Sequence, residues 1–161
     1  NQAKLAKNYY DHDTVGYNYR MSNILAALGI SQLEDLENRI IRKREIFNIY
    51  IELFEELGLS FIAPISHGSM NYWLSCFRFP ELKNKSISEL INTCLHVDNI
   101  ENRRIWSPLN SHEVNKGDFK GEDFPNSESI YENGICLNSN LSISYEQQLA
   151  VAKRIKDAHQ G

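Results

Sequence analysis

The sequence predicts an α+β fold, an α/β sandwich in which helices cover a small, partly antiparallel sheet. Two observations lead to this class. Apolar residues recur at helical spacing over a long stretch from Ile24 to Leu57, and after Gly58 short strand-like segments alternate with shorter helical ones. With so few strands the sheet is expected to be small. A long early helix packed on such a sheet would leave another surface for a partner.

The long helical pattern starts after Ser22 or Asn23, either of which can cap a helix because a short side-chain oxygen accepts a first-turn N–H. The pattern is too long for a typical globular helix. We therefore expect two helices, or one helix with a kink between Asp35 and Asn38, ended by Gly58. The basic run RIIRKRE within it is interleaved with glutamates, which favours a solvated helix face over a basic binding patch.

The rest of the chain is interpreted from local patterns. Residues 1–14 are polar and predict a connecting segment, and residues 111–125 predict a surface loop. Ser144 followed by Gln147 predicts a capping box at the start of the last helix. Strands are expected in LSFIAP (59–64), NYWLSCFRF (71–79), ENRRIW (101–106) and ICLNSNLS (135–142), and helices in SISELINTCLHV (86–97), SESIYENG (127–134) and SYEQQLAVAKRIKDAH (144–159).

Composition narrows the function classes. The 161 residues carry a formal net charge of −4, which gives no support to nucleic acid or an anionic membrane as a partner. Neither a run of 18 apolar residues nor a signal peptide is seen, so we expect a cytoplasmic protein. The three cysteines are far apart and without zinc-ligand spacing, and are interpreted as free core thiols.

Two short stretches carry candidate binding residues. In GYNYR, Gly16 to Arg20, the Asn18 amide, the Arg20 guanidinium and the following helix N-terminus suit an anion such as phosphate. Spacing alone slightly favours a simple turn with packed tyrosines. Arg103 and Arg104, followed by Trp106, suit a ligand with phosphate and a flat base. An exposed arginine pair beside a core tryptophan is an equally good interpretation.

Longer phrases then resemble a known family. GYNYRMSNILAALGISQLEDLENRIIRKREIFNIY, NYWLSCFRF, IENRRIWSPLN and GICLNSNLSISYEQQLAVAKRI follow in order over nearly the whole chain. Together they resemble the DegT/DnrJ/EryC1/StrS aminotransferases, which use pyridoxal 5′-phosphate and act on nucleotide-linked keto sugars. The phrases NYWLSC and IWSPL most resemble members that aminate UDP-linked 4-keto-6-deoxy-N-acetylhexosamines.

The resemblance implies the C-terminal small domain of a fold-type-I enzyme. Residues 1–22 would be a connector with the cofactor-phosphate loop, and residues 23–161 the small domain itself. None of the nine lysines stands in the family's Schiff-base motif, and the chain begins with Asn1 rather than Met. We therefore expect a fragment without activity of its own, whose parent is a homodimer with composite active sites and a glutamate amino donor.

The resemblance also implies roles for individual residues. Asn18 would contact the cofactor phosphate in the neighbouring subunit, and Tyr17, Tyr19 and Arg20 would meet substrate or the interface. Arg103, Trp106 and Asn110 would line the sugar-nucleotide side. The chain departs from the family where Arg104 replaces a frequent Pro, Asn110 a frequent His, and LNSN (137–140) an LPSG-like phrase. These departures imply a different sugar or a degenerate copy. A non-catalytic interaction or dimerisation module is therefore the alternative, and a basic-helix nucleic-acid binder a weaker one.

Overall fold

A computed structural model describes residues 4–6, 9–12, 21–64, 70–80, 99–115, 117–119 and 122–160, with backbone alone for 4–6, 9–12 and 160. The chain divides into two compact units. One contains residues 35–105 and 132–161, and the other residues 1–34 and 106–131. The expected helix at 86–97, with Cys94, lies outside the described residues, and so does the GYNYR stretch.

The unit of residues 35–105 and 132–161 has an α+β architecture, as predicted. Its sheet has the strand order β3-β5-β4, and every described pairing in it is antiparallel. The expected strand at 59–64 is reduced to one bridge between Ile62 and Arg78. The elements of this unit are α2 (Leu36–Glu56), β3 (Ser75–Arg78), β4 (Asn102–Arg104), β5 (Gly134–Leu137) and α5 (Tyr145–Gln160).

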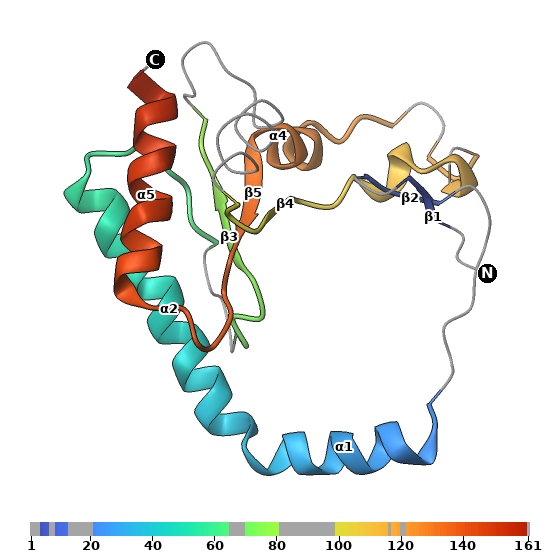
Figure 1. The fold of residues 1–161 in the computed structure, drawn as a ribbon. Coiled ribbons are helices and arrows are strands. Elements are labelled where there is room, and N and C mark those ends of the chain that lie inside the picture. The colour runs from blue at the N-terminus through green and yellow to red at the C-terminus, as the bar shows by residue number, and fades with distance from the viewer. Residues whose placement is uncertain are drawn as a thin grey trace. The chain divides into compact units, whose positions relative to one another are not determined.

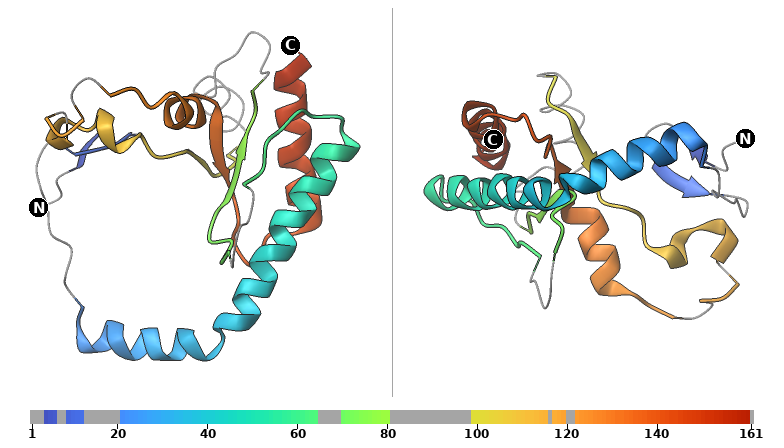
Figure 2. Two further views of the ribbon diagram at one scale, coloured as in Figure 1. Left: turned by 180° about the vertical axis from the view of Figure 1, so that it is seen from behind. Right: turned by 90° about the horizontal axis from the view of Figure 1, so that it is seen from below.

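Helices α2 and α5 lie side by side against one face of this sheet (Figures 1 and 2). Aromatic rings fill the space between α2 and β3. The Phe54 ring lies 5.0 Å from that of Phe77 in an edge-on arrangement, and Phe47 stacks on Phe77 at the same centroid distance. Edge-on and offset ring pairs stabilise the fold beyond the contribution of the apolar area that they bury. Ile135 and Leu137 of β5, with Val151 and Ile155 of α5, complete a core that is almost entirely closed to solvent.

The ends of the helices follow local chemistry, as predicted. The long pattern divides at Asp35, whose φ of −108° and ψ of 11° leave the helical region. Gly58 ends α2 with φ +67°, and two backbone bonds close the end: Leu59 N–H to Phe54 O at 2.9 Å and Gly58 N–H to Glu55 O at 3.0 Å. This is a Schellman motif, which needs a left-handed residue that glycine adopts without strain.

Helix α5 starts with the predicted capping box. The Gln147 N–H donates to Ser144 Oγ at 3.2 Å, and the Ser144 N–H donates back to Gln147 Oε1 at 2.9 Å. Two first-turn donors that have no partner within a helix are thereby satisfied.

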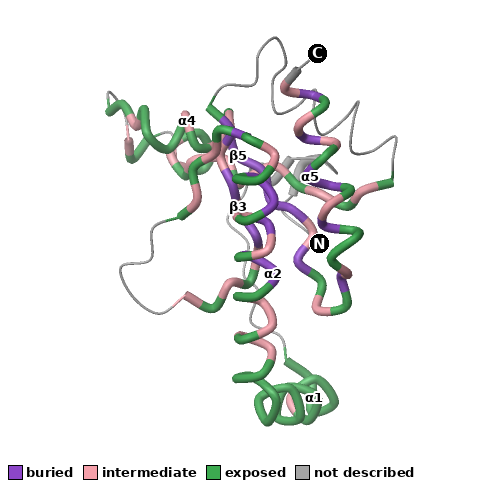
Figure 3. Tube along the Cα trace, turned by 90° about the vertical axis from the view of Figure 1, so that its left-hand side faces the viewer, coloured by how far each residue is buried: buried purple, intermediate pink, exposed green. Residues whose placement is uncertain are grey.

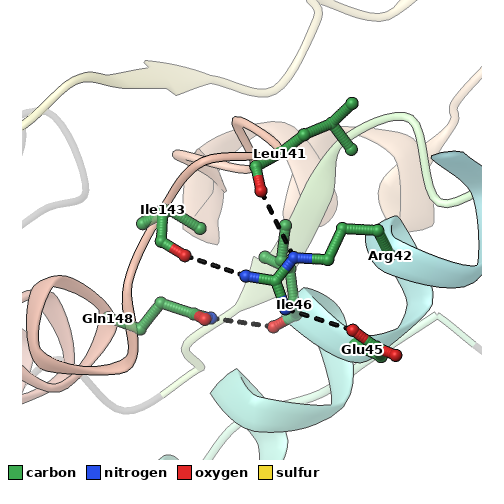
Figure 4. Close-up of polar contacts among 6 residues, drawn as sticks. All are labelled: Arg42, Glu45, Ile46, Leu141, Ile143 and Gln148. Atoms are coloured by element: carbon green, nitrogen blue, oxygen red, sulfur yellow. Dashed lines mark hydrogen bonds and ion pairs between the residues drawn. The ribbon is translucent and has the colours of Figure 1, made fainter.

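The basic run of α2 corrects one prediction. It is not simply a solvated face, because the Arg42 guanidinium donates to Leu141 O at 3.2 Å and to Ile143 O at 2.9 Å (Figure 4). Lys43 Nζ donates to the carbonyl oxygens of Trp73 and Ser139. The long stems of both side chains span from the helix to loop carbonyls. The basic run therefore ties α2 to the segment between β5 and α5.

A buried amide joins the same two helices. The Gln148 side chain of α5 is fully buried, and its Nε2 donates to Ile46 O of α2 at 2.8 Å (Figure 4). Tyr50 is fully buried as well, and its hydroxyl donates to Asn138 O at 3.0 Å. Burial raises the pKa of Tyr50 well above the usual range, so it stays a neutral donor.

The second unit contains shorter elements. Within the predicted connecting segment at residues 1–14, β1 (Lys4–Ala6) and β2 (Tyr9–His12) form an antiparallel pair, which the sequence patterns did not predict. Part of the predicted loop at 111–125 forms 3₁₀ turns. The other elements are α1 (Asn23–Glu34), the 3₁₀ turns η2 (Leu109–Ser111) and η3 (Glu113–Asn115), and α4 (Pro125–Asn133), whose last two residues belong to the sheet unit.

Helix α1 has no buried residue, although it is rich in apolar side chains (Figure 3). Among the described residues, none of the helices combines the length and apolarity needed to cross a membrane.

We predict that Phe54→Ala lowers the free energy of unfolding by about 3–5 kcal/mol, because it removes a fully buried ring and leaves a cavity between α2 and β3. Ile41→Ala is the matched control on the same helix, since Ile41 is 51% exposed. Urea denaturation monitored by circular dichroism measures both. Equal losses for the two variants would contradict this placement of the core.

Candidate functional site

The cofactor-phosphate prediction lies outside the described residues. Tyr17, Asn18, Tyr19 and Arg20 all fall there, so their roles stay predictions. The helix that comes directly after them is described. Ser22 caps α1, because its Oγ accepts the Leu25 N–H at 3.3 Å. The expected anion loop is therefore succeeded at once by a helix N-terminus.

Arg103 lies on the sheet face that α2 and α5 do not cover. It pairs with Cys136 of β5, whereas Arg104 pairs with Ile135, a residue of the buried core. Side chains of directly paired residues share a face, and neighbours along a strand alternate. Arg104 therefore belongs to the face that packs against the helices, and Arg103 to the opposite one, where it is exposed.

Cysteines continue the row in which Arg103 lies. Cys76 of β3 pairs with Cys136, and Cys136 pairs with Arg103, so the three cross the sheet side by side. Both thiols are free, as predicted, but only Cys136 is buried. Cys76 is half-buried, so its assignment to the core was too strong.

Trp106 and Asn110 belong to the other unit. Trp106 is 43% exposed and is not the core residue that one interpretation expected. Asn110 lies half-buried within η2, a turn closed by the Ser111 N–H and hydroxyl, which both donate to Pro108 O.

Sequence reasoning missed a polar pair in this turn. Ser107 Oγ lies 3.0 Å from His112 Nε2, and His112 is only 9% exposed. The spacing of five residues matches no common motif. The available signal was Pro108, whose fixed φ favours a tight turn that brings the two side chains together. The pair holds the turn that carries Asn110.

The described lysine side chains do not meet the needs of a covalently bound cofactor. Such a lysine must present a neutral amine to the ligand. Burial lowers the pKa of Lys43, but its Nζ hydrogen-bonds to Trp73 O, Ser139 O and Ser139 Oγ. Lys153 and Lys156 lie on α5, exposed and half-buried respectively. The side chains of these three lysines therefore do not fit the attachment of pyridoxal phosphate.

Comparison with protein families decides the identity. Residues 2–156 match the DegT/DnrJ/EryC1/StrS aminotransferase family. The chain belongs to this family. Its members are pyridoxal-phosphate-dependent aminotransferases.

Three curated DegT-family relatives show the range of activities. The putative pyridoxal phosphate-dependent aminotransferase EpsN of Bacillus subtilis is 34% identical over 91% of this chain and 38% of its own length. The GDP-perosamine synthase of Vibrio cholerae is 31% identical over 98% of this chain and 42% of its own length. The UDP-4-amino-4,6-dideoxy-N-acetyl-beta-L-altrosamine transaminase of Campylobacter jejuni serotype O:2 is 44% identical over 31% of this chain and 14% of its own.

A solved structure of the same kind matches the fold. The putative sugar aminotransferase Spr1654 from Streptococcus pneumoniae, in its PMP form, aligns with a TM-score of 0.69 and 25% identity over 94% of this chain and 38% of that one. The chain thus spans about two fifths of the length of the relatives that it matches along most of its own length.

We predict that Ser107→Ala lowers the free energy of unfolding by about 1–2 kcal/mol, because the buried His112 loses a hydrogen-bond partner. Ser111→Ala is the control in the same turn, since the Ser111 hydroxyl bond is exposed. Thermal unfolding of the two variants measures the difference. If Ser107→Ala is no more destabilising than Ser111→Ala, the pair does not hold the turn.

Proposed function

We propose that this chain is the small C-terminal domain, residues 23–161 with the connector 1–22, of an aminotransferase that aminates a nucleotide-linked keto sugar. The substrate is a UDP-linked 4-keto-6-deoxy-N-acetylhexosamine, used in surface-polysaccharide or glycan synthesis. The complete enzyme is a cytoplasmic homodimer with glutamate as amino donor. The match of residues 2–156 to the aminotransferase family carries the proposal.

The relatives support the substrate class. A GDP-perosamine synthase and a UDP-amino-sugar transaminase both have nucleotide-linked amino sugars in their names. The match to the UDP-sugar enzyme covers 31% of this chain at 44% identity, whereas that to the GDP-sugar enzyme covers 98% at 31% identity. The choice of a UDP-linked substrate rests on the resemblance of the phrases NYWLSC and IWSPL to members that act on UDP-linked sugars.

In this proposal the chain binds and orients the substrate. Arg103, exposed on the sheet face opposite α2 and α5, pairs with a phosphate of the nucleotide. The exposed indole of Trp106 offers a stacking surface, and Asn110 an amide for the sugar. Pyridoxal phosphate supplies the electron sink for transamination when bound, and its lysine comes from outside the described residues.

One observation favours the alternative, a non-catalytic interaction or dimerisation module. Helix α1 exposes apolar side chains along its length, among them Ile24, Leu25, Leu28, Ile30 and Leu33, which are all more than half exposed. An apolar surface of this kind is typical of an interaction site. A domain of a larger enzyme also presents such a surface where it meets the rest of that enzyme. The exposed side chains of α1 therefore fit both functions, and a measurement of activity distinguishes them.

The proposal predicts that a chimera carrying this chain gains a new substrate preference. In the chimera this chain replaces the matched two fifths of the V. cholerae GDP-perosamine synthase. Because the chain is proposed to bind the nucleotide sugar, we expect amination of a UDP-linked 4-keto-6-deoxy-N-acetylhexosamine with glutamate. Product formation is measured by mass spectrometry beside that from GDP-4-keto-6-deoxymannose.

The parent synthase is the control, and cofactor absorbance with circular dichroism establishes that the chimera is folded and loaded. A preference for the GDP sugar would contradict the UDP assignment alone. A folded, loaded chimera that aminates neither sugar would contradict catalysis and favour the interaction module.

A further inference from the structure

The two thiols in the sheet lie closer together than their separation in sequence suggests. Cys76 and Cys136 are 60 residues apart, yet they stand directly opposite each other on β3 and β5. Their Sγ atoms are 3.3 Å apart. Neither takes part in the substrate-binding role proposed above.

The backbone hydrogen bonds of β3 show whether Cys76 and Cys136 form a hydrogen-bonded or a non-hydrogen-bonded antiparallel pair. Arg78 exchanges both backbone bonds with Ile62, at 2.8 and 3.0 Å, on the edge of β3 away from β5. The Phe79 N–H, by contrast, donates to Asn133 O at 2.9 Å, on the β5 side. Because successive residues of a strand turn their N–H and C=O groups to opposite edges, Cys76 turns its groups the same way as Arg78. Cys76 and Cys136 are therefore a non-hydrogen-bonded pair.

This geometry suits a covalent bond between the strands. In non-hydrogen-bonded antiparallel pairs the Cα atoms are about 4.5 Å apart and the side chains are at their closest. Disulfides accept Cα separations of about 4.4–6.8 Å. Bond formation then needs the sulfur atoms to approach from 3.3 Å to about 2.05 Å, which side-chain rotation provides without moving a strand.

The two thiols differ in reactivity. Cys76 is half-buried, whereas Cys136 is only 3% exposed. The hydrogen bond with Cys136 lowers the pKa of Cys76 despite the opposing effect of burial. The same hydrogen bond, with burial, raises the pKa of Cys136, and the nearby Arg103 guanidinium partly offsets that rise. Cys76 is thus the more accessible thiol and the one that loses its proton more readily, and Cys136 is the thiol that reacts second.

We propose that Cys76 and Cys136 are a modification site that forms a reversible disulfide by exchange with a low-molecular-weight disulfide. The Cys76 thiolate attacks one sulfur of the oxidant RSSR, the oxidant's S–S bond breaks, and RS⁻ leaves and takes up the proton that Cys76 released. Cys136 then loses its proton and attacks the Cys76 sulfur of the mixed disulfide, which expels the second RSH. The two protein thiols are oxidised to one disulfide, and RSSR is reduced to two RSH.

The test uses the 161-residue chain with Cys94→Ser, so that only the pair remains. After incubation with oxidised glutathione, the chain is denatured, alkylated and weighed. We expect loss of both alkylatable thiols, a chain lighter by two hydrogen atoms, and full return of both thiols with dithiothreitol. A chain that keeps both thiols, or that forms disulfide-linked dimers on a non-reducing gel, would overturn the proposal.

Single variants test the order of the steps. Cys136→Ser should stop at one glutathione adduct on Cys76, whereas Cys76→Ser should gain no adduct because Cys136 is buried. An adduct on Cys136 in the second variant would overturn the proposed order. If either variant does not fold, the unmodified chain gives the answer, since its tryptic digest should contain one peptide pair joined through Cys76 and Cys136. A pair joined through Cys94 instead would overturn the assignment.

Discussion

The packing of α2 against one face of a three-stranded sheet is the contact on which the rest of the sheet unit depends. Strands β3, β4 and β5 are three or four residues long and could not stay paired in water without a hydrophobic cover. The rings of Phe47, Phe54 and Phe77 provide that cover between helix and sheet. Core burial of this kind is the main favourable term in folding. Arg42 and Gln148 then fix where the segment leading into α5 meets α2.

That packing divides the sheet into two faces with different chemistry. One face is covered by α2 and α5. The other carries the row of Cys76, Cys136 and Arg103. The division depends on strand register, because a shift by one residue would exchange every side chain between the faces. The adjacent arginines show the consequence, since Arg104 shares the core face with Ile135 while Arg103 lies on the opposite one. The proposed binding role of Arg103 and the core-face position of Arg104 thus fall on neighbouring residues.

The elements that could be predicted are those whose causes are local in sequence. The Ser144 capping box and the Gly58 helix end each involve residues within a turn or two, so the sequence shows them directly. The contacts that could not be predicted join distant segments. Arg42 reaches carbonyls about a hundred residues away, and its charge alone suggested a solvated position. The facing of Cys76 and Cys136 depends on register, which no spacing between them indicates.

The residues of the candidate site also differ in whether the sequence alone could predict their position. Residue types singled out the GYNYR stretch as a candidate anion site, and the family resemblance then gave Asn18 its expected contact with the cofactor phosphate. The placement of Arg103 on the face opposite α2 and α5 needed the register of β4. The most direct test of the account compares Arg103→Ala with Arg104→Ala in the cofactor-loaded chimera by calorimetric titration with UDP-N-acetylglucosamine. Loss of one charge-assisted bond, about 1.5–3 kcal/mol, predicts roughly 10–150-fold weaker binding for Arg103→Ala. Arg104→Ala should keep its affinity and lose thermal stability instead. Unchanged affinity in Arg103→Ala, or a larger loss in Arg104→Ala, would contradict the proposal that Arg103, on the face opposite α2 and α5, binds the substrate.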